Sequence, residues 1–225
     1  MTYDLVRSKK RKNTISLQVK KDGSIVIHAP YFTPRGEIDR FFKKKKNWLL
    51  RKIEERQISR NINTPKVFLS GEDFLFLGVS YPLKIEVGYN GDGPLTFTAG
   101  QFIMERESVS SGRELFKAWY KTTAKGFIEE RVCHYSKILN LYPTRLRISD
   151  AKFRWGSCSY DNRLSFSWRL IMAPGSVIDY VVIHELAHIR EKNHSKAFWN
   201  FLAGIMPDYR APRLWLKENG HLLDI

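Results

Sequence analysis

The spacing of apolar and polar positions changes repeatedly along the 225 residues. Apolar and polar side chains alternate over residues 15–19 and 24–29, on either side of a Lys-Asp-Gly turn, which predicts short β-strands within residues 3–30. From about residue 35 to residue 57 the apolar positions take helical spacing. Glycines and prolines interrupt the next stretch, about 67–103, whose pattern favours a second β-rich segment.

In the second half of the chain, helical periodicity alternates with extended segments. Ser110 and Ser111, followed by Glu114, can cap the start of a long helix. This order of elements predicts an α+β fold: a basic β-rich region with one helix over residues 1–105, then a second domain over residues 106–225. The predicted helices cover about 110–139, 175–191, 195–204 and 211–218, and the strands 145–148 and 164–168.

A metal-binding motif lies on the helix predicted at 175–191. His184-Glu-Leu-Ala-His188 places two imidazoles four residues apart, so both lie on one helix face and can reach one ion. Glu185 is displaced by one residue, which lets its carboxylate stand beside the ion and move a proton from water to a leaving group. The turns before the motif are strongly apolar, which suits a buried site. The alternative is two structural histidines beside a surface glutamate.

The third ligand of the predicted site must come from outside this helix, because hydrolytic zinc sites usually keep three protein ligands and one position for water. His194 is the candidate, six residues after the motif. Asn193 can adopt the left-handed conformation that ends a helix, and Ser195 can cap the next one, so the chain can reverse there. The competing third ligands are Glu191, Asp208, Glu218 and His221.

Only two cysteines occur, Cys133 and Cys158. Two are too few for a disulfide framework, and they lack the C-x-x-C spacing of a thiolate metal clip. We therefore expect two reduced thiols. A thiolate ligand from Cys158 is the alternative, since thiolate suits zinc.

Four blocks of the sequence resemble the YgjP-like metallopeptidases, which are relatives of the SprT and WLM zinc proteases. The resemblance covers most of the chain and is strongest over about residues 152–209. It implies that residues 106–225 form a zincin-like catalytic domain, in which the helix of the motif packs on a small antiparallel sheet. It also implies His184, His188 and His194 as zinc ligands and Glu185 as the catalytic base. The blocks are Arg154-Trp-Gly-Ser-Cys-Ser159, Trp168-Arg-Leu-Ile-Met-Ala-Pro174, Val177-Ile-Asp-Tyr-Val-Val-Ile-His184 and His184-Glu-Leu-Ala-His-Ile-Arg-Glu-Lys-Asn-His-Ser-Lys-Ala-Phe-Trp199.

The net charge of +15 is concentrated at the N-terminal end of the chain. Residues 1–60 contain 17 Lys and Arg against 6 Asp and Glu, a net charge of +11, with runs at residues 9–12 and 43–46. Such a field attracts polyanions, which include nucleic acid, nucleotides and an acidic membrane face. The alternative is a solvated basic surface that aids solubility.

Three functions fit these features. The first is a zinc-dependent metallopeptidase acting on peptides or unfolded proteins, whose extended substrate would pair with an edge strand such as residues 164–168. The second is a nucleoside triphosphate pyrophosphatase or phosphohydrolase on the same site, since phosphates require cationic groups and the chain has many. The third is a nucleic-acid-associated binding module with a structural metal, although such a site has no need of Glu185 as a base.

The sequence also bears on the location of the protein. Its N-terminus is charged and lacks the apolar core of a secretory signal. No segment reaches the roughly 18 uncharged apolar residues of a transmembrane helix. We expect a cytoplasmic protein with no membrane partner, and the sequence leaves its oligomeric state open.

Overall fold

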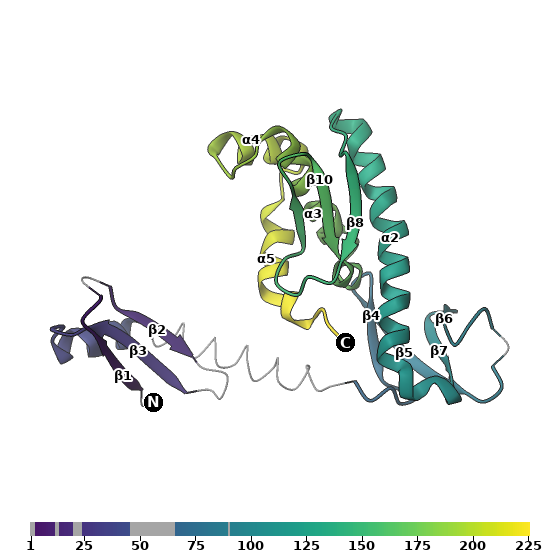
Figure 1. The fold of residues 1–225 in the computed structure, drawn as a ribbon, viewed down its shortest axis with the longest axis horizontal. Coiled ribbons are helices and arrows are strands. Elements are labelled where there is room, and N and C mark those ends of the chain that lie inside the picture. Colours follow the sequence, from purple (N-terminus) through teal and green to yellow (C-terminus); the bar gives the residue numbers. More distant parts are fainter. Residues whose placement is uncertain (1–2, 12–13, 20–23, 46–65, 90) are drawn as a thin grey trace. The chain divides into compact units, whose positions relative to one another are not determined.

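The computed structural model describes residues 3–11, 14–19, 24–45, 66–89 and 91–225 (Figure 1). Contacts within the chain divide it into two compact units, Met1–Thr64 and Pro65–Ile225. The boundary expected from the sequence, at residue 105, lies inside the second unit. The second β-rich segment shares a core with the long helix that follows it, as described below.

The first unit is a small mixed sheet with a helix. The strand order is β1-β3-β2, with β3 parallel to β1 and antiparallel to β2. Ile27 and Ala29 on β3 are fully buried with Ile38 from the helical residues 35–45. The alternating pattern thus predicted these strands correctly, while the rest of the helix expected to residue 57 lies outside the described residues. The strands are β1 (Asp4–Ser8), β2 (Ser16–Val19) and β3 (Ile25–Pro30).

The second unit begins with a four-stranded mixed sheet in the order β4-β5-β7-β6. Aromatic side chains join this sheet to helix α2: the rings of Phe74 and Phe116 stack with centroids 3.8 Å apart, and Phe102 lies 5.0 Å from Phe116. This shared core is the reason that the sheet belongs with the C-terminal part of the chain. The elements are β4 (Asp73–Phe76), β5 (Val79–Glu86), β6 (Leu95–Thr98), β7 (Gln101–Glu105) and α2 (Gly112–Leu139).

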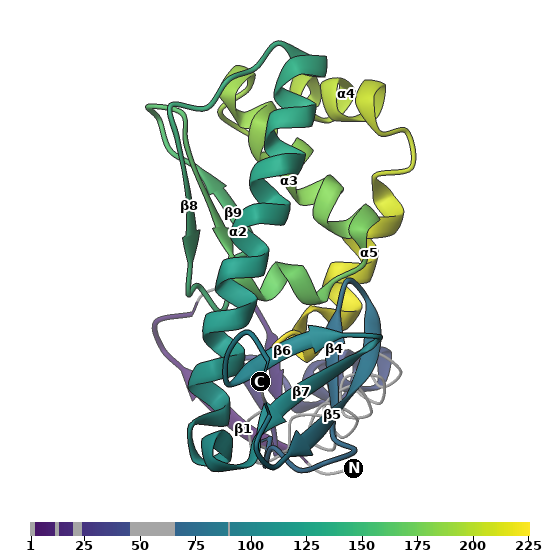
Figure 2. The same cartoon turned by 90° about the vertical axis from the view of Figure 1, so that its right-hand side faces the viewer.

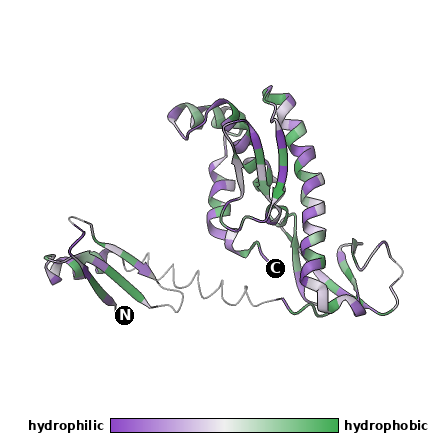
Figure 3. Ribbon diagram, viewed as in Figure 1, coloured by the Kyte–Doolittle hydropathy of each residue, from purple (hydrophilic) through white to green (hydrophobic). Residues whose placement is uncertain are grey.

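Helix α2 runs along the second unit, from the β4–β7 sheet at one end to strand β8 at the other (Figure 2). Polar and apolar bands alternate along it (Figure 3). The side chain of Ser111 at its N-cap forms no capping hydrogen bond, because residues 106–111 already turn as a 3₁₀ helix that leads directly into α2. One residue in four is buried, which gives a narrow core-facing stripe: Gly112, Phe116, Tyr120, Ala124, Ile128, Val132 and Ser136.

A second sheet, in the order β8-β10-β9, lies against the helix that carries the histidines. The expected antiparallel sheet is in fact mixed: β10 is antiparallel to β9 but parallel to β8. The reason is that β9 and β10 form a hairpin, which makes them antiparallel, while the other edge of β10 pairs with β8 in parallel. The elements are β8 (Arg145–Ser149), β9 (Gly156–Cys158), β10 (Arg163–Ser167), the 3₁₀ helix η2 (Trp168–Met172) and α3 (Gly175–Arg190).

Two short helices complete the chain, α4 (Lys196–Ile205) and α5 (Arg210–Asn219), followed by a 3₁₀ turn at Gly220–Leu222. Both helices lie within one or two residues of their predicted bounds. The hydroxyl of Ser195 accepts a hydrogen bond from the Phe198 backbone N–H, so the predicted cap of α4 is confirmed. None of the described helices has the length and apolar character needed to cross a bilayer.

A buried arginine fastens the C-terminus to the end of strand β8. Arg169 is 4% exposed; its Nε lies 2.9 Å from a carboxylate oxygen of Asp224, and its Nη1 lies 2.8 Å from one of Asp150. Asp150 also accepts a hydrogen bond from Trp168 and pairs with Lys117 of α2. The hydrogen bond from Lys117 holds the pKa of the Asp150 carboxyl well below its ordinary value. Burial acts in the opposite direction, but the hydrogen bonds from Arg169 and Trp168 add to the lowering.

Replacing Arg169 by Gln should lower the free energy of unfolding by about 2 kcal/mol. The reason is that the partly exposed carboxylates of Asp150 and Asp224 lose the buried guanidinium with which they pair. The matched change Lys84→Gln removes an exposed pair with Glu86 and should cost less than about 0.5 kcal/mol. Because the pKa of Asp150 is lowered in the folded protein, its ion pairs stabilise the fold above the ordinary value of 3.8, and this stabilisation is lost as the pH falls below it. The difference in free energy of unfolding between Arg169→Gln and wild type should therefore narrow in acid. Urea unfolding at pH 7 and pH 3 measures this; equal stability of the two variants at pH 7 would contradict it.

Candidate metal centre

Helix α3 carries two histidines of the predicted site on one face. Its first three turns are almost wholly buried, with Ile178 and Val182 at 0% exposure, and this packing fixes the helix against the core. His184 and His188 follow on the face turned toward α4, with ring centroids 5.0 Å apart and both within 5 Å of the Phe198 ring. The four-residue spacing thus produces the neighbouring imidazoles that the sequence predicts.

His194 comes back to these two rings in the turn between α3 and α4. Its Nε2 lies 2.9 Å from Nε2 of His184, and its ring centroid lies 4.7 Å from that of His188. The turn differs from the prediction at Asn193, which does not take up the left-handed conformation. Instead, the Asn193 side chain accepts a hydrogen bond from the Ser195 backbone N–H, which tightens the reversal without positive φ.

The three histidines form the one group of possible metal ligands found among the described residues, with ligand atoms within 4.8 Å of one another. Burial, and then the neighbouring His188 and His194, lower the pKa of His184 to about 3, so its imidazole stays neutral at physiological pH. The competing ligands Glu191, Asp208, Glu218 and His221 do not join this group.

Glu191 contributes through its backbone rather than its carboxylate. Its carbonyl oxygen lies 2.9 Å from Nδ1 of His188, so that nitrogen can donate to it and the ring is held with Nε2 as the lone-pair donor. Burial lowers the pKa of His188 as well, which keeps this ring in its neutral, ligating form. Cys158 lies outside the histidine group, and both cysteines are free thiols, as expected.

Glu185 is a buried carboxylate beside the histidines. It is 6% exposed, and this burial raises its pKa to about 7. The charge of Arg154 and a hydrogen bond from the backbone of Cys158 act in the opposite direction but do not overcome the desolvation. A carboxyl group whose pKa lies near neutrality can both accept and return a proton under physiological conditions.

The Arg154–Ser159 block, whose chemistry the sequence left open, brings strand β9 against this carboxylate. A Cβ atom at Gly156 would lie 2.6 Å from Cγ and Oε1 of Glu185. Only glycine permits this approach, because any side chain would occupy the space of the carboxylate. The glycine thus determines where the Glu185 carboxylate lies.

Strand β9 is one of the two edge strands of its sheet, and β8 is the other. The predicted edge strand, residues 164–168, is β10 and lies in the centre, so it has no free edge. The backbones of Trp155 and Ser159 bond to β10 through Ser167 and Arg163. Because backbone groups of an antiparallel strand alternate in direction, those of Gly156 and Cys158 point away from β10, and the backbone of Cys158 hydrogen-bonds to Glu185.

A hollow of about 360 Å³ opens beside His184 and Glu185. Tyr180, one helical turn before His184, is 6% exposed and lines it, so this tyrosine both packs in the core and reaches the site. Three cationic side chains that sequence reasoning did not assign line the same hollow: Arg154, Arg213 and Lys217. The last two are spaced four residues apart on α5, and this spacing is the signal that could have placed them on one face.

The sequence profile of the YgjP-like metallopeptidase domain matches residues 13–219, which is most of the chain. The chain belongs to the YgjP-like metallopeptidase family. The resemblance noted in the sequence is therefore confirmed, and membership supports hydrolase chemistry with a bound divalent metal. Described as a whole, the YgjP-like chain is a mixed α/β protein with small mixed sheets.

Two known proteins are similar to parts of this YgjP-like chain. A 50-residue segment is 40% identical to the UTP pyrophosphatase of Escherichia coli strain K12; it spans 20% of this chain and 30% of that relative's length. The crystal structure of the metallopeptidase zymogen of Pyrococcus abyssi abylysin is similar over 40% of this chain and 93% of its own, with 22% identity and a TM-score of 0.37.

Replacing Gly156 by Ala should displace the Glu185 carboxylate, since the new methyl group would lie within 2.6 Å of it. We expect the hydrolytic rate to fall roughly 100-fold, as for other small misplacements of a catalytic group, with metal content unchanged. Gly126→Ala is the matched control, because a Cβ atom there meets nothing within 4 Å. Wild-type turnover in the Gly156 variant would show that β9 does not position the carboxylate.

Proposed function

We propose that this chain is a zinc-dependent metallopeptidase in which His184, His188 and His194 hold the metal and Glu185 is the general base. The observation that carries the proposal is the placement of a buried carboxylate, with a pKa of about 7, next to three converging imidazoles. A purely structural metal site has no use for such a carboxylate, whose burial costs stability.

The residues present fit a zinc ion. Nε2 of His184 and Nε2 of His194 face each other at 2.9 Å, a separation that suits one neutral N–H···N hydrogen bond or two bonds to a shared cation. Because burial lowers the pKa of His184, its ring carries no positive charge that would repel a cation. Three neutral imidazoles are a donor set that zinc binds with one position left open, and zinc held in this way acidifies water and polarises carbonyl groups.

Glu185 would hold and move the proton in this mechanism. With a pKa near 7 it is ionised in part of the molecules, accepts a proton from the attacking water, and returns it to the leaving amine. The hydrogen bond from the Cys158 backbone and the contact with Gly156 hold the carboxylate in place through both transfers.

The free edge of β9 supports a peptide as the substrate. The backbone groups of Gly156 and the carbonyl of Cys158 point away from β10, where an extended peptide can add as a further strand. The hollow lined by Tyr180 and Val181 then offers an apolar surface beside the scissile bond. A zincin-like arrangement of helix and edge strand is part of this proposal.

A second candidate function is a nucleoside triphosphate pyrophosphatase. The observation that favours it is the set of three cations around the hollow, Arg154, Arg213 and Lys217, which suits the charge that develops on phosphates during hydrolysis. The partial likeness to a UTP pyrophosphatase points the same way, although it spans only 30% of that protein.

The basic first unit is proposed, separately, to contact polyanions. Lys9, Lys10 and the helical residues 43–45 are exposed, so their charges are available to a partner, while residues 12 and 46 of the two predicted runs lie outside the described residues. This role would also suit the third reading, a nucleic-acid-associated module, but that reading leaves the buried Glu185 unused.

The chain should purify with about one zinc ion, because three histidines complete a site of hydrolytic type. His188→Ala should lose the metal at micromolar protein concentrations. His134→Ala removes an exposed histidine of α2 and should keep it. Elemental analysis after gel filtration measures both; full occupancy in the His188 variant would remove this residue from the ligand set.

Glu185→Gln should keep the zinc and the fold, but its turnover should fall by a factor of about 10² to 10⁴, because an amide cannot accept the proton. Wild type and variant should be compared on unfolded protein, short peptides and nucleoside triphosphates, with the exposed change Glu114→Gln as control. Cleavage of peptides supports the first function. Cleavage of triphosphates alone, with a raised KM in Arg213→Gln, supports the second, and full turnover in Glu185→Gln excludes both mechanisms.

A further inference from the structure

The face of the β8-β10-β9 sheet opposite to α3 carries a row of arginines. In the strand register, Arg145 of β8 lies beside Arg163 of β10, and Arg147 lies beside Ser165, which pairs in turn with Ser157 of β9. Side chains alternate between the two faces of a strand, so these five share one face. The intervening positions Leu146, Ile148, Leu164 and Phe166 belong to the core on the other face.

The arginines surround a hollow of about 540 Å³, separate from the hollow at the metal centre. Arg145, Arg147 and Arg163 are exposed. The carboxylate of Asp161, also at this hollow, is already paired with Arg163 at 2.7 Å. Among the described residues Arg145 and Arg147 form no ion pair with a carboxylate, so the face keeps a net positive charge. Arg154 lines both hollows and connects the two surfaces around the edge of β9.

Hydroxyl groups lie between the guanidinium groups of this face. Nε of Arg147 donates to the hydroxyl of Ser165 at 3.2 Å, and the hydroxyls of Ser157 and Ser159 line the same hollow. At the end of the sheet, the Lys192 ammonium is held by the carbonyl of Ser159. Fixed guanidinium groups with interspersed hydroxyls are the side chains that bind phosphate oxygens with most geometric specificity.

Exposed aromatic rings lie in the loops at both ends of this sheet. Tyr160, in the β9–β10 turn, is 92% exposed, and Phe153, beside Arg154, is 101% exposed. Tyr142, just before β8, is 61% exposed. Cationic grooves with exposed aromatic rings are typical of surfaces on which nucleobases stack.

We propose that this face, defined by Arg145, Arg147, Arg163 and Arg154 and called the arginine face, binds the phosphate groups of nucleotides, carried either by a free nucleotide or by a single nucleic-acid strand. It goes beyond the proposed hydrolysis, because three of its four arginines do not line the metal centre. It is also distinct from the lysine-rich first unit, whose charges belong to another part of the fold.

The arginine face is tested by measuring binding to zinc-loaded Glu185→Gln protein, because turnover does not interfere in this variant. The probes are inorganic tripolyphosphate, a nucleoside triphosphate and a fluorescent 12-nucleotide oligothymidine. Combining Arg145→Gln, Arg147→Gln and Arg163→Gln should weaken binding at least tenfold and lower the log–log salt slope for the oligonucleotide by about 2, at roughly 0.7 for each lost contact. The zinc content should stay unchanged.

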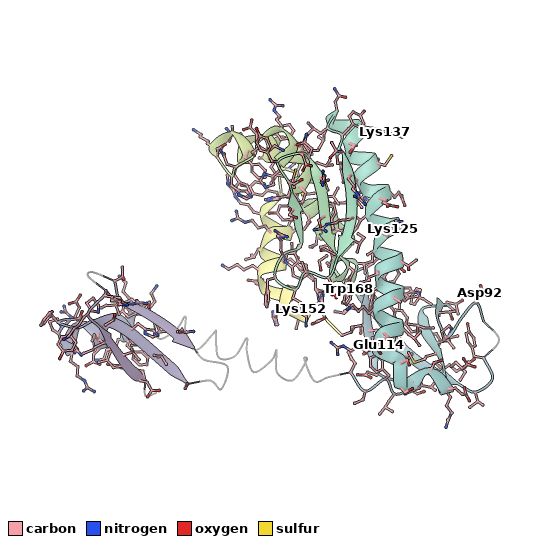
Figure 4. The ribbon with its side chains drawn as sticks, in the orientation of Figure 1. Asp92, Glu114, Lys125, Lys137, Lys152 and Trp168 are labelled. Carbon is pink, nitrogen blue, oxygen red and sulfur yellow. The ribbon has the colours of Figure 1, made fainter. Side chains whose placement is uncertain are left out.

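The matched control removes three positive charges from α2 by combining Arg113→Gln, Lys125→Gln and Lys137→Gln; the two lysines point away from the sheet (Figure 4). It should bind as the parent does. Stronger binding of longer oligonucleotides, lost in Tyr160→Ala, identifies a strand as the ligand; tight, length-independent binding of the triphosphate identifies a free nucleotide. Equal loss in control and test variants, binding that depends on Arg213 instead, or no binding of any probe would overturn the proposal.

Discussion

The contact between a backbone and a carboxylate organises the whole centre: Gly156 of β9 lies against the side chain of Glu185. This contact removes Glu185 from water, raises its pKa to about 7, and leaves a backbone hydrogen bond from Cys158 to hold it. A side chain at residue 156 would separate the sheet from α3. The hollow beside the histidines exists because strand and helix meet at this distance.

The cost of burying the Glu185 carboxylate, and part of the His184 and His188 rings, must be met by the rest of the unit. The first turns of α3 are embedded in an apolar core that also contains the stripe of α2 and the rings of the β4–β7 sheet. Arg169 adds a polar anchor, joining the C-terminus to the end of β8, close to the loop that leads into β9. Rigid packing of this kind keeps the buried carboxylate and the neighbouring imidazoles in place although their burial is unfavourable.

Cationic groups surround the centre on two sides. Arg213 and Lys217 face the hollow at His184 and Glu185, while the arginines of β8 and β10 lie on the outer face of the sheet. Arg154 borders both, and its charge also acts on the pKa of Glu185. This geometry allows binding of phosphates and hydrolysis to be separate properties of neighbouring surfaces.

The sequence by itself determined the elements and the ligand candidates. Local periodicity and caps located α3, α4 and α5 within a residue or two, and the spacing of His184 and His188 determined their common face. Long-range pairing decided the rest: β10 became the central strand instead of the edge, the second β-rich segment joined the core of α2, and Gly156 met Glu185. No local pattern encodes which strands become neighbours, because that choice depends on burying apolar faces contributed by distant segments, and so only the tertiary structure could reveal the role of the Arg154–Ser159 block.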